Sequence, residues 1–216
     1  MSHTKIKICG ITSLADARYC AGAGVDYLGF IQYPESPRYI PASEAKAIIE
    51  WLYGPETVGV FVNESAETVN RVVAETDFDV AQIHGQMLPD EIARISCKTI
   101  MALAVTEETT EAALRGQLAT YEDAVDYFLL DTAKAGLYGG TGATFNWDIA
   151  RNLTAEYPLF IAGGLGPDNI AEVITTLSPF AIDLSSSVES SPGEKDFDKL
   201  GELFDVYDAF RAPESE

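Results

Sequence analysis

The chain has few of the side chains from which metal sites and disulfide frameworks are built. Its 216 residues include two histidines, His3 and His84, and three cysteines, Cys9, Cys20 and Cys97. An odd number of cysteines without a Cys-x-x-Cys pair disfavours a disulfide framework and a cysteine-type zinc site. A histidine-based cluster is hard to build from two residues. We therefore expect no metal ion and no disulfide, as in a reducing cytoplasm.

Long apolar runs are also lacking, although 47% of the residues are hydrophobic. A helix needs about 20 consecutive apolar residues to cross a bilayer, and no run approaches that length. The first residues, Met1–Lys7, contain no apolar segment typical of a signal peptide. We expect no membrane contact and a cytoplasmic location. The length is typical of one domain, so residues 1–216 are predicted to form a single domain.

Basic residues are scarce. The chain has 14 Lys and Arg against 34 Asp and Glu, which gives a net charge of −20. Such a charge repels nucleic acid and anionic membranes, so we expect neither as a partner. Nothing in the sequence indicates an obligate protein partner. The acidic residues are scattered rather than gathered in one block, which fits either a highly soluble protein or one adapted to a salty cytoplasm.

Short β-branched segments alternate eight times with amphipathic segments. The predicted strands are Lys5–Cys9, Tyr27–Ile31, Thr57–Val62, Val80–His84, Thr99–Ala104, Tyr127–Asp131, Leu159–Ala162 and Ala181–Leu184. The predicted helices are Ser13–Ala21, Pro41–Leu52, Ser65–Ala74, Leu88–Ile95, Glu107–Tyr121, Trp147–Leu153, Pro167–Leu177 and Phe197–Phe210. This alternation predicts an α/β protein with a single (β/α)8 barrel, the TIM barrel. An open doubly wound sheet is the alternative, disfavoured because no Gly-x-Gly-x-x-Gly follows the first strand.

In such a barrel the reactive groups follow the C-terminal ends of the strands. Lys7 and Cys9 share one face of the first predicted strand. Lys7 either pairs internally with Asp183 or faces a ligand, because a buried charge needs a partner. Cys9 is either a small buried side chain or a thiol whose pKa is lowered by the nearby cation. Asp131 ends the sixth strand, as a reactive acid or as a solvated or helix-capping one.

The last two strand ends carry a pattern typical of phosphate binding. Ala162-Gly163-Gly164-Leu165 and Ser185-Ser186-Ser187 each precede a predicted helix or turn. Glycine lets a backbone approach a ligand, exposed N–H groups at helix starts bind anions, and these two loops are the usual phosphate site of barrels. Two tight turns without a ligand are the alternative. The long segment Asp131–Phe145 predicts a loop that closes over the site.

Eight short motifs, in this order, resemble those of the phosphoribosylanthranilate isomerase family. They are Lys7-Ile8-Cys9-Gly10-Ile11-Thr12, Gly29-Phe30 with Ser36-Pro37-Arg38-Tyr39, Val58-Gly59-Val60-Phe61, Gln82-Ile83-His84-Gly85, Leu130-Asp131, Gly139-Gly140-Thr141-Gly142, Ala162-Gly163-Gly164-Leu165 and Asp183-Leu184-Ser185-Ser186. Each motif is weak alone, but their common order is specific. The resemblance extends over nearly the whole chain.

The resemblance implies an Amadori rearrangement in tryptophan biosynthesis, from N-(5-phosphoribosyl)anthranilate to 1-(2-carboxyphenylamino)-1-deoxyribulose 5-phosphate, with no cofactor or metal. It implies that Cys9 is the general base and Asp131 the general acid, with Arg38 on the anthranilate carboxylate. The residues implied to contact the remaining substrate are Lys7, Gln82 and His84. Those implied to bind the phosphate are Gly142, Gly163, Gly164, Ser185 and Ser186. Burial would keep Asp131 protonated, and positive charge would keep Cys9 ionised.

Two residues depart from the pattern of the family. Ser187 stands where glycine is usual, which would strain the loop if that position needs a positive φ. Gln32 stands where an aromatic or apolar residue is commoner.

Three other functions remain open from the sequence. Indole-glycerol-phosphate synthase relies on a catalytic lysine and glutamate, and inward-facing lysines are few here. Ribulose-phosphate epimerase uses paired aspartates and a metal whose histidine ligands this chain lacks. A phosphate-binding barrel without catalytic activity is the third.

The net charge of −20 generates a prediction about salt. If the acidic surface is an adaptation to salt, self-repulsion destabilises the folded state at low ionic strength. The Debye length falls from ~10 Å at 0.1 M to ~3 Å at 1 M. We therefore expect a higher melting temperature in molar potassium chloride than in dilute buffer. A melting temperature that stays flat or falls across this range would rule out the adaptation.

Overall fold

Eight parallel strands form a closed barrel in the computed structural model, which describes residues 3–132 and 147–211. The strands are β1 (Lys5–Cys9), β2 (Tyr27–Ile31), β3 (Glu56–Val62), β4 (Val80–His84), β5 (Lys98–Val105), β6 (Tyr127–Thr132), β7 (Leu159–Ile161) and β8 (Ala181–Leu184). Each pairs with its neighbours in sequence, and β8 pairs with β1 with Asp183 beside Lys7. The barrel prediction is confirmed, and the open sheet is wrong because this last pairing closes the ring.

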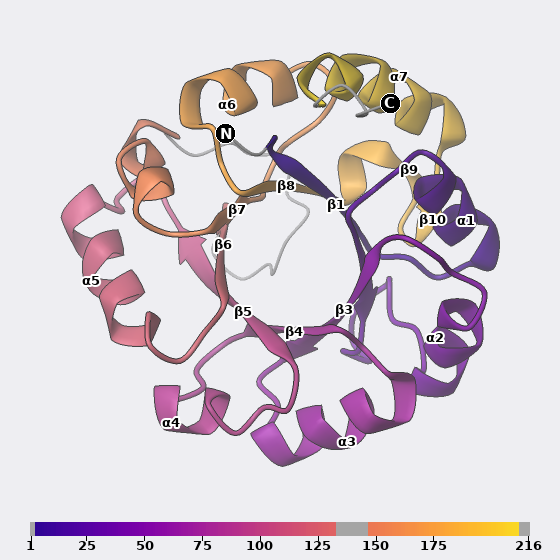
Figure 1. Cartoon of the computed structure of the whole chain (residues 1–216), viewed down its shortest axis with the longest axis horizontal. Helices are drawn as coiled ribbons and strands as arrows, with labels where there is room; N and C mark the ends of the chain where they lie inside the picture. Colours follow the sequence, from indigo (N-terminus) through magenta and orange to yellow (C-terminus); the bar gives the residue numbers. More distant parts are fainter. Residues whose placement is uncertain (1–2, 133–146, 212–216) are drawn as a thin grey trace.

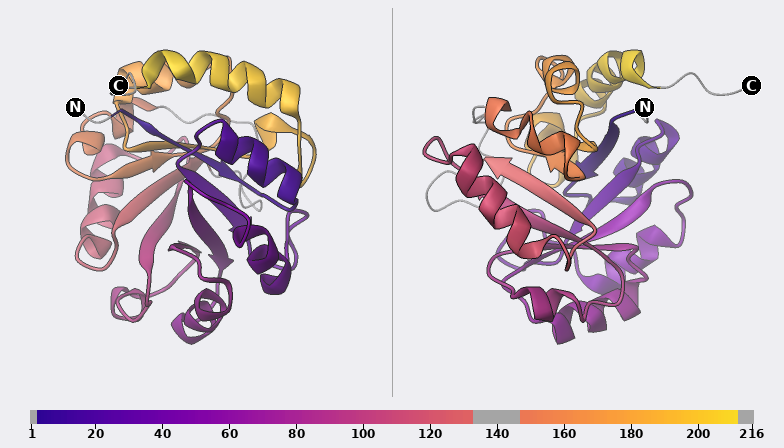
Figure 2. Two further views of the ribbon diagram at one scale, coloured as in Figure 1. Left: turned by 45° about the vertical axis from the view of Figure 1, so that its right-hand side comes forward. Right: turned by 60° about the vertical axis from the view of Figure 1, so that its left-hand side comes forward.

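Helices surround the barrel on its outside, as Figure 1 shows down the barrel and Figure 2 from two sides. They are α1 (Leu14–Gly22), α2 (Ala42–Ile49), α3 (Ala66–Thr76), α4 (Pro89–Ile92), α5 (Glu111–Tyr121), α6 (Ile170–Leu177) and α7 (Phe197–Tyr207). Side-chain oxygens cap the first turns of four of them and thereby fix where the helices begin. These caps are Ser13, Ser65, Thr110 and Asp196.

Two connections differ from the prediction. The segment predicted as a helix after β6 forms two 3-10 turns instead, η1 (Trp147–Ala150) and η2 (Leu153–Ala155). Pro158 disfavours helical backbone at Tyr157, the residue before it, and so ends this segment before β7. After β8, the 3-10 turn η3 (Ser186–Val188) leads into an antiparallel hairpin. Its strands, β9 (Glu189–Ser191) and β10 (Glu194–Lys195), lie beside α1 in Figure 1.

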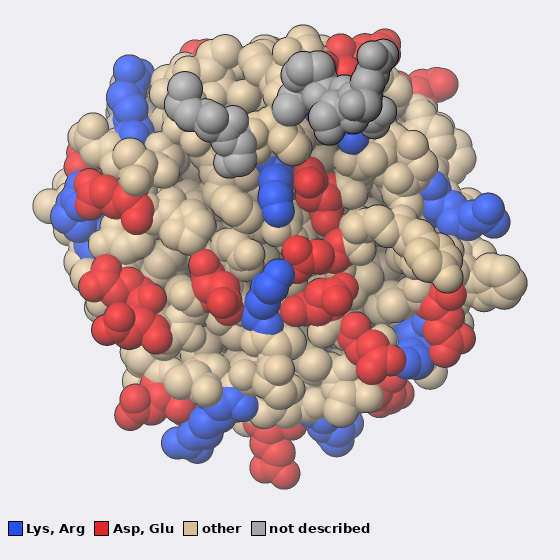
Figure 3. All heavy atoms as spheres, viewed as in Figure 1, with Lys and Arg blue, Asp and Glu red and all other residues tan. Residues whose placement is uncertain are grey.

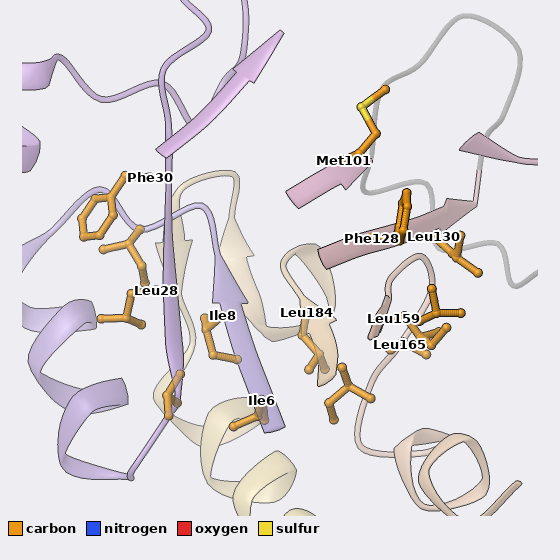
Figure 4. Close-up of a cluster of buried hydrophobic side chains, with 14 of the residues drawn as sticks. Ile6, Ile8, Leu28, Phe30, Met101, Phe128, Leu130, Leu159, Leu165 and Leu184 are labelled. Carbon is orange, nitrogen blue, oxygen red and sulfur yellow. The ribbon is translucent and has the colours of Figure 1, made fainter. Parts of the chain in front are cut away.

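Alternate side chains along each strand fill two separate apolar layers. Those pointing outward, such as Ile6, Ile8 and Phe30, pack against the helices (Figure 4). Those pointing inward fill the barrel, where Tyr27 meets Phe160 with ring centroids 5.3 Å apart. Toward the C-terminal ends of β1, β4, β6 and β8 the inward positions carry polar or ionisable side chains, whereas those of β3 stay apolar. The packed interior therefore forms the floor of a mouth whose wall is partly polar and partly apolar.

Acidic side chains are spread around the face seen in Figure 3, with basic side chains between them. This distribution agrees with the scattered acids of the sequence and shows no single acidic block on that face. In the described part of the chain, no helix has both the length and the apolar composition needed to cross a bilayer.

Candidate functional site

A cavity of about 440 Å³ opens at the C-terminal ends of the strands. Its wall contains most of the residues singled out in the sequence. These are Cys9, Arg38, Gln82, His84, Asp131, Gly163, Gly164, Ser185 and Ser186. Gly142 lies outside the described residues, as does most of the predicted loop Asp131–Phe145. The barrel therefore brings together residues from strands that are far apart in sequence.

Lys7 is buried inside the barrel rather than on the cavity wall. Its ammonium nitrogen Nζ lies 2.9 Å from Oδ2 of Asp183, and the two side chains are 0% and 8% exposed. Burial acts to lower the pKa of Lys7, but the Asp183 carboxylate outweighs it and raises the pKa above its ordinary value. The structure thus shows the internal ion pair, one of the two interpretations of Lys7.

Cys9 ends β1 directly above this ion pair, with 8% of its surface exposed. Burial raises the pKa of its thiol above the ordinary value, although the nearby ammonium groups of Lys7 and Lys195 act to lower it. The expectation of a lowered thiol pKa is therefore wrong for the protein without substrate. The physical reason is that the loss of hydration of a buried thiolate exceeds the stabilisation from the two cations.

Asp131 behaves as the sequence argument expected. Burial, together with the negative charge of Asp183, raises the pKa of Asp131 to about 6, while Lys7 acts in the opposite direction. Its carboxyl group faces the cavity from β6. A carboxyl with this pKa holds and releases a proton near neutral pH, as a general acid must.

Gln82 and His84 lie two residues apart on the inner face of β4. Gln82 Nε2 is 2.6 Å from His84 Nε2. Burial and the charge of Lys7 lower the pKa of His84 to about 4, so the ring is neutral at physiological pH. His84 can therefore exchange hydrogen bonds with a ligand without adding charge to the cavity.

The loop after β7 has a backbone conformation that requires glycine. Gly163 and Gly164 both have positive φ, +87° and +66°. A Cβ atom at Gly163 would lie 2.7 Å from the backbone nitrogen of Thr132, so only glycine fits there. Asn169 holds the loop by accepting a hydrogen bond from Gly166 N at 2.9 Å and donating one to Gly164 O at 2.8 Å. Because Gly163 and Gly164 carry no side chain, a ligand in the cavity can approach the backbone of this loop.

Neither departure from the family pattern places a residue other than glycine at a positive φ. Ser187 lies in the turn η3. The non-glycine residues with positive φ in the described ranges are Asn63, Asp77 and Ser178. The suggested strain at Ser187 is therefore wrong. Gln32 donates a hydrogen bond from Nε2 to the carbonyl oxygen of Ile40 at 3.1 Å, which fastens the loop that carries Arg38.

Two charged residues beside Arg38 were given no role from the sequence, although both fall within the long resemblance. Glu189 accepts hydrogen bonds from Arg38 Nε at 2.9 and 3.0 Å and from Arg38 Nη2 at 2.7 Å. Lys195 donates to Glu189 Oε1 at 2.8 Å and to the carbonyl oxygen of Cys9 at 2.6 Å. Burial acts to raise the pKa of Glu189, but Arg38 and Lys195 hold it below its usual value. In the two short strands of this polar hairpin only Glu189 and Lys195 are buried, and so few residues give no periodic signal from which these contacts could be predicted.

Comparisons with known proteins show the family to which this chain belongs. The family described as N-(5'-phosphoribosyl)anthranilate (PRA) isomerase matches residues 6–206. The chain belongs to this family. A phosphoribosylanthranilate isomerase of Trichlorobacter lovleyi is 44% identical over 202 residues, which cover 92% of this chain and 95% of that protein. The resemblance stated from the sequence is confirmed, and the synthase and epimerase families are wrong for this chain.

Solved isomerases share the whole fold. The isomerase of Thermotoga maritima superposes with a TM-score of 0.86 at 34% identity, covering 95% of this chain and 99% of that one. Another phosphoribosylanthranilate isomerase, with a TM-score of 0.83 and 32% identity over 95% of this chain and 99% of its own, is in complex with reduced 1-(o-carboxyphenylamino)-1-deoxyribulose 5-phosphate. In the described part of our chain, no group of three or more His, Cys, Asp or Glu residues is placed to hold a metal ion.

The raised pKa of Asp131 generates a prediction about stability. The folded-state pKa of about 6 exceeds the ordinary value of 3.8. Between these values the unfolded chain holds fewer protons, so this group costs stability as the pH rises through that window, and the full cost remains above pH 6. Asp131→Asn should therefore stabilise the protein more at pH 7 than at pH 4, as measured by urea unfolding. A difference between variant and wild type that is equal at both pH values would contradict the raised pKa.

Proposed function

We propose that this protein catalyses the isomerisation of N-(5'-phosphoribosyl)anthranilate to 1-(2-carboxyphenylamino)-1-deoxyribulose 5-phosphate in tryptophan biosynthesis. One observation carries this function: Cys9 and Asp131 both lie on the wall of one cavity, and the pKa of Asp131 is about 6. Between the ends of β1 and β6, the cavity offers one candidate base and one candidate acid. An aldose-to-ketose rearrangement needs these two groups and no net oxidation.

The acid and the base act at consecutive stages. Asp131 donates its proton to the ring oxygen of the furanose as the bond from C1′ to that oxygen breaks, which leaves a protonated Schiff base at C1′. The thiolate form of Cys9 then removes the proton from C2′. The electron pair of that C–H bond forms a double bond between C1′ and C2′, while the π electrons of the C1′–N bond move onto nitrogen. The resulting enolamine tautomerises to the ketone as C1′ gains a proton and the C2′ hydroxyl loses one. Proton exchange with solvent returns Asp131 to the acid and Cys9 to the thiolate. Atoms and electrons balance, since the product is an isomer of the substrate.

The remaining wall residues hold the two ends of the substrate. The backbone around Gly163, Gly164, Ser185 and Ser186 binds the phosphate, as the left-handed turn after β7 supports. Arg38 binds the anthranilate carboxylate, because its guanidinium group lies on the cavity wall beyond the ends of β1 and β2. Gln82 and His84 contact the middle of the substrate. The phosphorylated, carboxylated ligand of the related isomerase has both of these ends.

The direct test is turnover of the substrate itself. Purified protein is mixed with freshly prepared N-(5'-phosphoribosyl)anthranilate, and the anthranilate-type fluorescence is followed over time. We expect a protein-dependent loss of fluorescence, and heat-denatured protein provides the control. Saturable binding of the substrate without any loss of fluorescence would identify a phosphate-binding barrel without this activity.

Substitution of the acid or the base should lower kcat far more than it changes KM. Positioned proton transfer contributes typically ~10²–10⁴-fold to a rate. Cys9→Ser and Asp131→Asn should therefore each lose at least ~10²-fold in kcat. The double variant should lose less than the product of the two losses, because the groups serve one reaction sequence. Arg38→Ala should instead raise KM, since it removes the partner of a carboxylate.

The matched control for these variants is Cys97→Ser, because Cys97 lies outside the cavity wall. Steady-state kinetics and circular dichroism should show a folded protein with wild-type kcat. A folded Cys9→Ser or Asp131→Asn protein with near wild-type kcat would contradict the assigned roles.

The two pKa directions also predict the pH dependence of kcat/KM. Burial raises the pKa of Cys9, whereas the pKa of Asp131 is about 6. The base thus has the higher pKa. The active form has a protonated Asp131 and an ionised Cys9. Between pH 6 and the pKa of Cys9, the fraction of protonated Asp131 falls by the same factor by which the fraction of Cys9 thiolate rises, so the amount of active form is constant. We expect kcat/KM to stay level from pH 6.5 to 8. A decline that begins near pH 6 would show that the thiol is already ionised there.

A further inference from the structure

Arg38 meets Glu189 along one edge of its guanidinium group. The atoms Nε and Nη2 of Arg38 both donate to the carboxylate of Glu189. The opposite edge of the guanidinium group is left for a ligand, since Nη1 has no hydrogen-bond partner among the described residues. The fork of donors on arginine matches a second carboxylate on that side. Glu189 therefore determines which edge of Arg38 a ligand can use.

Burial makes this contact selective. The side chains of Arg38, Glu189 and Lys195 are 16%, 3% and 0% exposed. Together they carry one net positive charge, because two cations share one carboxylate. A ligand with one carboxylate beside Arg38 neutralises the cluster. A ligand without it leaves the exposed edge of a partly desolvated guanidinium group unpaired, which is costly.

Lys195 ties the same cluster to the ends of β1 and β8. Its ammonium nitrogen donates to Cys9 O at 2.6 Å and to Ser185 O at 3.3 Å, besides Glu189. The backbone of Gly10 makes room for this arrangement, since a Cβ atom there would lie 2.8 Å from Arg38 Cδ and 3.3 Å from Glu189 Oε1. The hairpin β9–β10 thus contacts the carboxylate-binding arginine, the strand of the base and the phosphate loop.

We propose that Glu189, itself held by Lys195, is a positioning residue that orients Arg38 and so makes the protein select substrates with a carboxylate on the aromatic ring. This inference rests on the proposed function, because it takes Arg38 as the ligand of the anthranilate carboxylate. Glu189 lies behind Arg38 and acts on the substrate through it. Two residues of the hairpin after β8, Glu189 and Lys195, thus determine the specificity for a carboxylated amine.

The test compares two phosphorylated probes in two proteins. One probe is reduced 1-(2-carboxyphenylamino)-1-deoxyribulose 5-phosphate, and the other is its phenylamino counterpart without the carboxylate. Wild type should prefer the carboxylated probe by about 10–100-fold, the range expected for a charged hydrogen-bonded contact. Glu189→Gln should lose most of this preference while its affinity for the phenylamino probe changes little. Titration calorimetry measures all four affinities.

The direction in which Glu189→Gln changes the preference for the carboxylated probe distinguishes a positioning role from an effect of net charge. Glu189→Gln adds one net positive charge to the cluster, so an effect of charge alone would increase the preference for the carboxylated probe. An increase, an unchanged preference, or equal losses for both probes would overturn the inference. The control is Glu194→Gln, which removes an exposed carboxylate from the same hairpin and should leave the preference as in wild type.

A failure of the proposed function gives a different result. Wild type would then show no preference between the probes, and Arg38 would not be the carboxylate ligand. If Glu189→Gln does not fold because Lys195 is left unpaired, Glu189→Gln/Lys195→Met removes both members of that pair and restores the net charge of the cluster. This double variant should also lose the preference for the carboxylated probe, and a retained preference would equally overturn the inference.

Discussion

The buried ion pair between Lys7 and Asp183 is the interaction on which the site depends. It joins β1 to β8 where the barrel closes, and the two residues are direct partners in the strand register. Asp183 Oδ1 has no hydrogen-bond partner among the described residues, so the pair is not fully satisfied. Replacing such a pair by apolar side chains is often neutral or stabilising. Its presence is therefore better explained by its effect on the cavity above than by stability.

That effect is visible in three groups that reach the cavity. Lys7 acts to lower the pKa of Cys9, His84 and Asp131, while Asp183 acts to raise those of Cys9 and Asp131. Burial is the largest influence on all three. As a result His84 is neutral, Asp131 titrates near neutral pH, and the thiol is reluctant to ionise. The Lys7–Asp183 ion pair and burial in the barrel thus determine the protonation states of these three groups at the start of the reaction.

Much of the fold was predictable from the sequence because its signals are periodic and local. All eight strands were predicted with bounds within one residue, since each is a short apolar run followed by glycine or polar residues. Lys7, Cys9, Gln82 and Asp131 fall on inward positions by strand alternation alone. The hairpin with Glu189 and Lys195 could not be predicted, because its contacts join residues distant in sequence. The pKa direction of Cys9 also depends on burial, which a sequence does not show.

The central claim is that burial beside the Lys7–Asp183 pair sets the proton state of the cavity acid. It is tested most directly by titrating the Asp131 carboxyl group in the substrate-free protein by carbon NMR, with Asp131→Asn to assign its resonance. The account predicts a pKa of about 6 in wild type and a lower pKa in Asp183→Asn, where a negative charge is lost and Lys7 remains. An Asp131 pKa near the ordinary value of 3.8 in both proteins would contradict it.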